Sequence, residues 1–473
     1  MNFDRDYLMT IDGKAVSSPS TIDVYNPATG TVFASVPDCT AEQLDAAVES
    51  SKKAFKTWKK VPIEDRAEYL RKIGRVITEN ADELTTLFTQ EQGRPLDFAR
   101  LEIESCEEWL KSIAEVRPPV NVSEDSAEQF VETRYFSLGV VCGIAPWNFP
   151  INLAIWKIAP ALLAGNTMVL KPSPFTPLCT LKIAELLRDV LPEGVLNVIT
   201  GGDNLGPMMT SHPGFAKISF TGSTATGKRV MESASKDLKR LTLELGGNDA
   251  AIVLPDVDVN EIAEKIFFGA FFNASQICIA TKRLYVHEDV YEPLKDKLLE
   301  IARATKVGNG LEAGIGMGPI QNKRQYDRVM NLLDDAKQSG LSLEYGSEVP
   351  EGDGYFVPIT IVDNPPEDSR VVQEEAFGPI LPMIKFNDID KVIEKANDSE
   401  YGLAGAVWSK DDEKGIEVAR QIETGTVWIN QNLILRPDTV FAGHKNSGFG
   451  GENGIEGLLE FMQPQAVYLA KSA

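Results

Sequence analysis

The stretch Lys217-Ile-Ser-Phe220-Thr-Gly222-Ser223-Thr-Ala-Thr-Gly227 decides the fold, because it has the pattern of a strand, a glycine turn and the start of a helix. Backbone N–H groups at such a turn and helix N-terminus can bind a phosphate group. The spacing is GxxxxG rather than GxGxxG, and no Walker-type Lys-Ser/Thr follows. A plain strand-to-helix turn is therefore the alternative interpretation.

The alternation of strand and helix continues on both sides of this stretch. Apolar runs predict strands at 166–170, 195–199, 217–220 and 249–254, and helical spacing covers 178–191. Strands that alternate with helices indicate a doubly wound parallel sheet. The same pattern resumes after Cys278, which predicts a second α/β domain from about 247 to 445.

The N-terminal part has a strand signal near 7–11 and a capping box at Thr40 and Gln43 that starts a helix. Helical spacing runs from Ile63 to about Val116 and is broken at 92–95. Residues 118–129 are polar and rich in turn formers, which predicts a boundary or an exposed excursion. A strand-like alternation follows from Val131.

Composition restricts the function. The 473 residues carry 47 Lys and Arg against 69 Asp and Glu, a net charge of −22, which argues against nucleic acid or an anionic membrane as partner. Residues 1–16 lack the apolar core of a signal peptide, and the apolar stretch 139–165 is interrupted by prolines. Five cysteines without a CxxC pattern fit reduced thiols in a cytoplasmic protein. Three scattered histidines make a metal site improbable, so we expect none.

Four polar residues could carry chemistry. Cys278 is a possible nucleophile, and Glu244 a possible base that activates water. Asn148, inside Pro146-Trp-Asn-Phe-Pro150, could donate to an oxyanion, and Lys171 stands at the carboxyl edge of a predicted strand. Each has a structural alternative: a buried inert thiol, an ion-paired carboxylate, a loop-stabilising amide and a solvated lysine.

The order and spacing of these blocks resemble the aldehyde dehydrogenase family from near residue 8 to about 465. The resemblance rests on seven motifs: Pro146-Trp-Asn-Phe-Pro150, Lys171-Pro-Ser173, Phe220-Thr-Gly-Ser-Thr224, Glu244-Leu-Gly-Gly247, Gln276-Ile-Cys278, Glu374-Glu-Ala-Phe-Gly-Pro379 and Lys445-Asn-Ser-Gly448. It implies a dinucleotide-binding domain at 1–117 and 139–246 and a catalytic domain at 247–445. It also implies a small β oligomerisation arm at 118–138 and 460–473, and hence a homodimer or homotetramer.

The resemblance implies oxidation of an aldehyde to a carboxylic acid with NAD or NADP. Cys278 matches the nucleophile that forms a thiohemiacetal and then a thioacyl-enzyme, and Asn148 with the Cys278 backbone N–H matches the oxyanion donors. Glu244 matches the base for deacylation. Lys157 and Glu452 match positions linked to proton relay, although Gly451 stands where a basic residue often precedes the relay glutamate.

The implied cofactor contacts lie in the strand-end motifs and the Glu-Glu-Ala-Phe block. They are Ile144, Ala145, Pro146, Trp147, Lys171, Ser173, Pro174, Gly202, Gly206, Phe220, Gly222, Ser223, Gly227, Leu245, Glu375 and Phe377. Pro174 stands where NAD-preferring relatives often have a glutamate that binds the adenosine ribose. Without that carboxylate a 2′-phosphate meets no like charge, so we expect the enzyme to accept both NAD and NADP.

The implied substrate tunnel is apolar and bulky. Its residues are Phe149, Leu153, Trp156, Ile277, Ile279, Leu435 and Phe441. Such walls favour medium aliphatic or aromatic aldehydes. Asn152 and Arg436 are polar exceptions near the entrance. Arg436 could hold the carboxylate of a semialdehyde, or it could be solvated or pair with Asp438.

Three other functions remain open within the same resemblance. The first is a non-catalytic, crystallin-like protein, which the presence of Cys278, Glu244 and Asn148 disfavours. The second is acyl transfer to coenzyme A, which is disfavoured because enzymes of that kind often lack the glutamate matched by Glu244. The third is a simple esterase, which would not need the cofactor motifs. Ser275 and Ala442 replace common glycines and could shift the pocket wall.

Overall fold

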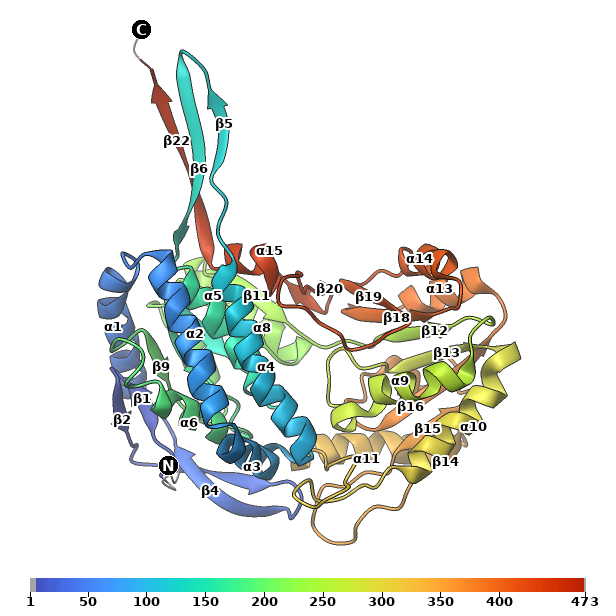
Figure 1. Ribbon diagram of the computed structural model, residues 1–473. Coiled ribbons are helices and arrows are strands. Elements are labelled where there is room, and N and C mark those ends of the chain that lie inside the picture. Colours follow the sequence, from blue (N-terminus) through green and yellow to red (C-terminus); the bar gives the residue numbers. More distant parts are fainter. Residues whose placement is uncertain (1–5, 472–473) are drawn as a thin grey trace.

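Figure 1 presents the computed structural model of the chain, which describes residues 6–471. Two lobes lie side by side, each built around a β-sheet with helices packed on it, and a three-stranded arm projects away from the first lobe. Within the described residues, no helix combines the length and apolar character needed to span a membrane.

The first lobe contains an eight-stranded sheet. In spatial order its strands are β2 (Lys14–Val16), β1 (Met9–Ile11), β9 (Leu196–Val198), β8 (Thr167–Lys171), β7 (Val140–Ile144), β10 (Lys217–Thr221), β11 (Arg240–Glu244) and β21 (Gly448–Phe449). Strands β7 to β11 are parallel, which confirms the doubly wound α/β class. The antiparallel edge strands β1, β2 and β21 were not predicted as such.

Both faces of this sheet are covered, as the side chains of β8 show. Met168 and Leu170 pack in one hydrophobic cluster, whereas Val169 packs in another. Successive side chains of a strand point to opposite faces, so each cluster marks one layer of helices. The helices of this lobe are α1 (Ala41–Trp58), α2 (Ile63–Glu79), α3 (Ala81–Gln92), α4 (Leu96–Glu115), α5 (Asn152–Leu163), α6 (Leu178–Leu186), α7 (Leu205–Ser211) and α8 (Thr224–Ala234).

Helix boundaries follow local chemistry. The predicted capping box at Thr40 and Gln43 is present at the start of α1. Gly93, with φ 94°, ends α3 and produces the predicted break before α4. The predicted helix 178–191 ends at Leu186 instead. After it, backbone hydrogen bonds join residues three apart, as in a tight turn; Arg188 N, for example, donates to Glu185 O.

The second lobe contains a seven-stranded sheet. Its strands in order are β14 (Ser342–Tyr345), β15 (Thr360–Asp363), β16 (Ile380–Phe386), β13 (Arg283–His287), β12 (Ala250–Val253), β18 (Ala404–Trp408) and β19 (Thr426–Ile429), all parallel except β14. Its helices are α9 (Val259–Phe271), α10 (Glu288–Ala304), α11 (Lys323–Gln338), α12 (Arg370–Gln373), α13 (Ile389–Asn397) and α14 (Asp412–Ala419).

The arm consists of β5 (Asn121–Asp125), β6 (Gln129–Ser137) and β22 (Met462–Ala470), which follows α15 (Gly454–Leu459). Part of the polar stretch 118–129 is thus a strand rather than a plain boundary, because β6 supplies hydrogen-bond partners to it. Smaller pairs complete the structure: β3 (Thr21–Asn26) with β4 (Thr31–Pro37), and β17 (Tyr401–Gly402) with β20 (His444–Lys445).

Candidate active site

Cys278 lies on a loop between α9 and β13, called here the nucleophile loop (residues 272–279). Asn273, Ala274 and Ser275 all have φ between 53° and 60°, the left-handed region that costs energy for residues other than glycine. The loop keeps this conformation because its side chains are satisfied: Gln276 Nε2 donates to Asn273 O at 2.8 Å, and Gln276 Oε1 accepts from Gln321 N at 2.8 Å.

A buried ammonium group holds the other end of this loop. Lys282 Nζ donates to the carbonyl oxygens of Ile277 at 2.9 Å and Cys278 at 2.6 Å. The same Nζ lies 3.6 Å from Glu375 Oε1, which also accepts from Gly247 N at 3.1 Å. Lys282 therefore joins the nucleophile to Glu375, one of the expected cofactor residues.

The surroundings of Cys278 favour the protonated thiol. Burial raises its pKa to about 12; Lys282 acts against that rise, and the carboxyls of Asp249, Glu375 and Glu244 add to it. A thiol with this pKa is a weak nucleophile at neutral pH, since only the thiolate attacks. Cys278 thus needs a neighbouring group that removes its proton.

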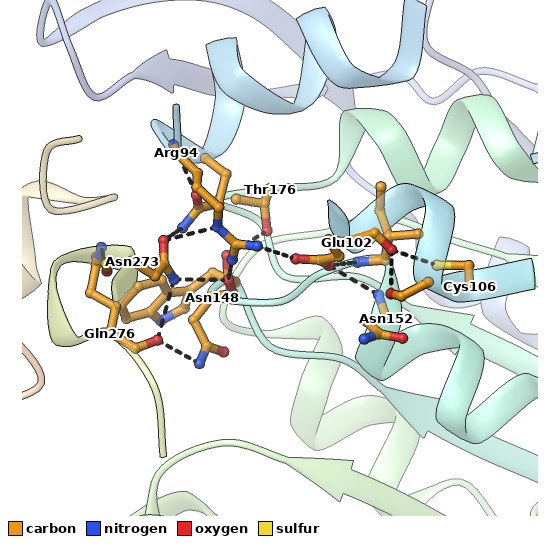
Figure 2. Close-up of polar contacts among 12 residues, drawn as sticks. Arg94, Glu102, Cys106, Asn148, Asn152, Thr176, Asn273 and Gln276 are labelled. Carbon is orange, nitrogen blue, oxygen red and sulfur yellow. Dashed lines mark hydrogen bonds and ion pairs between the residues drawn. The ribbon is translucent and has the colours of Figure 1, made fainter. Parts of the chain in front are cut away.

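Asn148 contacts the nucleophile loop directly. Its side-chain Nδ2 donates to Gln276 O at 2.8 Å, two residues before Cys278 (Figure 2). The amide retains a second hydrogen, which can donate to an oxygen that develops negative charge beside the sulfur. The expected oxyanion donor is therefore placed at the loop that carries the nucleophile.

Glu244, Glu452 and Lys157 form a buried group at the end of β11. Lys157 Nζ lies 2.7 Å from both Glu452 Oε1 and Thr221 Oγ1. Neither carboxyl oxygen of Glu244 has a hydrogen-bond partner among the described residues. Burial, with the nearby Glu452 carboxyl, raises the pKa of Glu244 well above its usual value, whereas Lys157 acts against the rise. A carboxylate in this state is a strong base once it is ionised.

Cys278, Glu244 and Glu452 line one cavity of about 270 Å³, whereas Asn148 and Lys157 are not among its lining residues. All seven expected substrate residues line it: Phe149, Leu153, Trp156, Ile277, Ile279, Leu435 and Phe441, together with Cys278, Glu244 and Glu452. Trp156 stacks on Trp109 with ring centroids 5.3 Å apart and meets Phe441 edge-on at 5.8 Å. The wall is therefore largely aromatic and apolar.

Sequence reasoning missed several members of this wall. Ser105, Trp109, Thr221, Phe272, Leu433 and Ile434 also line it. Ser105 and Trp109 are four residues apart on α4, a spacing that puts them on one face of a helix that the sequence predicts but does not assign to a site. Arg436 does not line the cavity; it is exposed and forms a bidentate pair with Asp438 at 2.9 and 2.6 Å.

A second cavity, of about 390 Å³, lies along the carboxyl ends of the first sheet. Expected cofactor residues on its wall are Ile144, Ala145, Pro146, Trp147, Lys171, Ser173, Pro174, Phe220, Gly222 and Ser223. The wall also includes residues not foreseen, namely Phe175, Thr221, Thr226, Asn322, Arg324, Gln325 and Arg328. Three of its lining residues are cationic and none is a carboxylate.

The remaining expected cofactor residues are not among those that line this cavity. A Cβ added to Gly202 or Gly206 would meet open space, so a ligand could approach the bare backbone there. A Cβ on Gly227 would collide with Leu245, so this pair serves close packing of α8. Phe377 packs edge-on against Trp147, with ring centroids 5.3 Å apart.

The residues of the second cavity fit a nicotinamide dinucleotide. Ser223 caps α8, whose N-terminus faces the cavity and favours a phosphate group. Lys171 is buried, and its single side-chain hydrogen bond within residues 6–471 goes to Pro172 O at 3.3 Å, which leaves donors for ribose or phosphate oxygens. Burial lowers the pKa of Lys171 to about 8.

Comparison with known proteins agrees with this geometry. The aldehyde dehydrogenase family model matches residues 15–467. The aldehyde dehydrogenase LUC3 of Fusarium sp. is 38% identical, over 98% of this chain and 98% of that protein. Phenylacetaldehyde dehydrogenase of Pseudomonas fluorescens is 37% identical, over 98% of this chain and 95% of its own. The NAD+ complex of the Bacillus cereus aldehyde dehydrogenase has a TM-score of 0.95 and 35% identity, and the match covers 99% of this chain and 97% of that one.

The fold and the two cavities define an oxidoreductase that uses a nicotinamide cofactor. The chain belongs to the aldehyde dehydrogenase family and is an NAD(P)-dependent enzyme. The resemblance drawn from the sequence motifs is thereby confirmed.

Proposed function

We propose that this enzyme oxidises medium aliphatic or aromatic aldehydes to carboxylic acids through a covalent bond to Cys278. The observation that carries the proposal is a single apolar cavity that contains the Cys278 thiol, the unpartnered Glu244 carboxyl and the aromatic pair Trp156 and Phe441. One aldehyde, one NAD(P)+ and one water give one acid, one NAD(P)H and one proton.

The first step is attack of the Cys278 sulfur on the aldehyde carbon. The thiol proton must leave first, and the Glu244 carboxylate faces the same cavity to accept it. The carbonyl oxygen becomes an oxyanion that Asn148 Nδ2 and the Cys278 backbone N–H stabilise. Bound NAD(P)+ supplies the hydride acceptor, so the adduct becomes a thioester on Cys278.

Hydrolysis of that thioester requires water and a base. Glu244, which has by then released the thiol proton, takes a proton from the water as the oxygen attacks the acyl carbon. The carbon–sulfur bond breaks, the acid leaves, and the proton on Glu244 returns to the Cys278 sulfur. Lys157 and Glu452 form the route by which the proton leaves the buried site, since Glu452 Oε1 and Lys157 Nζ are 2.7 Å apart. This glutamate-assisted release favours hydrolysis over transfer to coenzyme A.

The apolar wall sets the substrate class. Burial of each methylene contributes about 0.8 kcal/mol, roughly a fourfold gain in binding per carbon. The phenylacetaldehyde dehydrogenase relative acts on an aldehyde of this kind according to its name. A carboxylate-bearing semialdehyde is less favoured because Arg436, its only foreseen partner, is already paired with Asp438.

Either NAD or NADP is accepted in this proposal. Pro174 lines the cofactor cavity where a carboxylate would repel a 2′-phosphate, and Lys171, Arg324 and Arg328 add positive charge to the same wall.

The proposal includes the domain division that the family resemblance implies. It consists of a dinucleotide-binding part (1–117, 139–246), a catalytic part (247–445) and an arm (118–138, 460–473). Residues 1–5 and 472–473 lie outside the described residues. The arm exposes Val122, Phe136, Val467, Tyr468 and Leu469, apolar surface that favours pairing between subunits in a dimer or tetramer. All five cysteines are free thiols, which fits a reducing compartment such as the cytoplasm.

The test is an aldehyde panel of hexanal, benzaldehyde and succinate semialdehyde, with NAD+ or NADP+, in which acid and reduced cofactor are both quantified. We expect both products from the first two aldehydes. Cys278→Ala should abolish both, and Asn148→Ala should slow hydride transfer at least about a hundredfold, the usual effect of removing an oxyanion donor. Parent-rate turnover by Cys278→Ala would contradict the proposal.

A further inference from the structure

The connection between α3 and α4 carries a buried cation, Arg94, that the chemistry above does not use. Its side chain is 1% exposed, and the only carboxylate paired with it among the described residues is Glu102 on α4, at 2.7 Å and equally buried. A buried ion pair is weak support for stability, because loss of hydration offsets its attraction. The presence of the Arg94–Glu102 pair in the interior therefore calls for a geometric explanation.

Each nitrogen of the Arg94 guanidinium points to a different part of the active site (Figure 2). Nη2 donates to the main-chain oxygen of Asn148 at 2.7 Å, and Nε donates to Asn273 Oδ1 at 3.1 Å. Nη1 binds Glu102 Oε2 at 2.7 Å. One rigid, planar group thus fixes the main chain of Asn148, whose side chain is the oxyanion amide, relative to the nucleophile loop.

Asn273 completes the link between the two segments. Its Nδ2 donates to the same Asn148 oxygen, at 3.2 Å. Asn273 also has a left-handed backbone, with φ 53°, which starts the turn that leads to Cys278. The Asn148 main-chain carbonyl therefore accepts two hydrogen bonds, and rotation of its peptide plane would break both.

Glu102 extends the same network to the substrate wall. Its Oε1 accepts from the backbone N–H groups of Ile151 at 3.1 Å and Asn152 at 3.0 Å, at the N-terminus of α5. A carboxylate there is favoured by the unsatisfied N–H groups and the helix dipole. Arg94 Cζ also lies 4.2 Å from the ring centroid of Phe149, a residue of the substrate cavity.

We propose that Arg94, held by Glu102, is a positioning residue that sets the orientation of the Asn148 amide relative to Cys278. This inference rests on the proposed function of Asn148 as an oxyanion donor. Arg94 touches neither reacting atom; it acts through Asn148 and the nucleophile loop. A displacement of about 1 Å in such a group can cost about a hundredfold in rate.

A double-mutant cycle distinguishes positioning from a merely structural role. The rate of the first turnover is measured as the burst of reduced cofactor, for the parent, Arg94→Met, Asn148→Ala and the double variant, on holoenzyme. Arg94→Met should lower the burst rate about 30- to 100-fold in the parent, with little change in the aldehyde KM. In the Asn148→Ala background the same change should cost less than about threefold, because the amide that Arg94 orients is gone.

Arg66 offers a matched control. It is also a buried arginine, and it donates to the main-chain oxygens of Leu163 and Val61, both at 2.8 Å. Arg66→Met should destabilise the protein without changing the burst rate by more than about twofold in either background. Should Arg94→Met fold poorly, Arg94→Lys and Glu102→Gln enter the same cycle, with smaller effects of the same sign.

The outcomes distinguish the positioning role of Arg94 from the oxyanion role of Asn148. Equal losses from Arg94→Met in the parent and in the Asn148→Ala background overturn the positioning role and leave the oxyanion role intact. A near-parent burst rate in Asn148→Ala alone overturns the oxyanion role, and with it the inference about Arg94. An Arg66→Met variant with the same non-additivity overturns the claim that the effect is specific to Arg94.

Discussion

Replacement of Lys282 by methionine tests how the nucleophile and the cofactor site are joined. The change removes the ammonium group that donates to the carbonyls of Ile277 at 2.9 Å and Cys278 at 2.6 Å. A hydrogen bond from a charged donor contributes about 1.5–3 kcal/mol, so the two contribute about 3–6 kcal/mol. Recovered hydration of the buried ammonium offsets part of this. We expect the free energy of unfolding to fall by about 2–3 kcal/mol.

The same change should lower the reactivity of Cys278. Lys282 opposes the burial-driven rise of the Cys278 pKa, so its loss raises that pKa further and reduces the thiolate fraction at mildly alkaline pH. Glu375 loses its cation as well, which raises the pKa of that buried carboxyl and should increase the KM for the cofactor. Both effects act on the site rather than on global folding.

The assay combines urea unfolding with the rate of Cys278 alkylation by iodoacetamide in the native protein. Lys182→Met is the matched control, since Lys182 is a buried lysine on α6 that binds Glu185 at 2.9 Å, and it lines neither cavity. The control should lose stability while its alkylation rate stays at the parent value. If Lys282→Met also alkylated at the parent rate and kept the parent cofactor KM, the reasoning would be refuted.

Three further outcomes follow from the site. Glu244→Gln should slow the burst of reduced cofactor, because the Cys278 proton loses its acceptor, and also the later turnover, because deacylation loses its base. Because the raised pKa of Glu244 leaves it protonated at low pH, the parent kcat should fall as pH decreases through that pKa, while the variant lacks this dependence. Pro174→Glu should lower kcat/KM for NADP at least about tenfold while that for NAD changes little, because repulsion between the new carboxylate and the 2′-phosphate costs about 1.4 kcal/mol or more. In the parent, the ratio of kcat/KM for NAD over NADP should be below about a thousand. Arg436→Ala should leave hexanal and benzaldehyde oxidation within about twofold of the parent, since the exposed Arg436–Asp438 pair is worth little; selective loss of succinate semialdehyde activity would restore the semialdehyde alternative.

Residues at strand ends could be placed from sequence because parallel sheets gather the carboxyl ends of their strands at one edge. Lys171 ends β8 and Gly222 follows β10, so these two motifs were expected at strand ends, and the structure has them there. Glu244 ends β11, a strand that was not predicted from the sequence. The apolar wall around Cys278 was foreseen from the family resemblance, which also places the bulky side chains of Ile277 and Ile279 on both sides of the nucleophile.

Residues that act across long sequence separations could not be placed in this way. Glu102 occurs in the run Leu101-Glu-Ile-Glu-Ser105, where a carboxylate on an amphipathic helix is normally solvated. Lys282 precedes a strand as part of a Lys-Arg pair that looks like surface charge. Their burial depends on contacts with segments distant in the sequence, such as Ile151 and Asn152 for Glu102 and Glu375 for Lys282. Neither periodicity nor local propensity reports on such packing.

The late position of Glu452 in the chain has a consequence for biosynthesis. The chain leaves the first sheet after β11, builds the entire second sheet, and returns only at β21, close to the C-terminus, with Phe441 and Glu452 on the returning segment. A nascent polypeptide on the ribosome therefore exposes Cys278 well before the last wall of its chamber has been translated. The emerging enzyme should remain inactive until Glu452 has left the ribosome, and frameshifts or cleavage before Glu452 should abolish turnover even where most of the molecule has already folded.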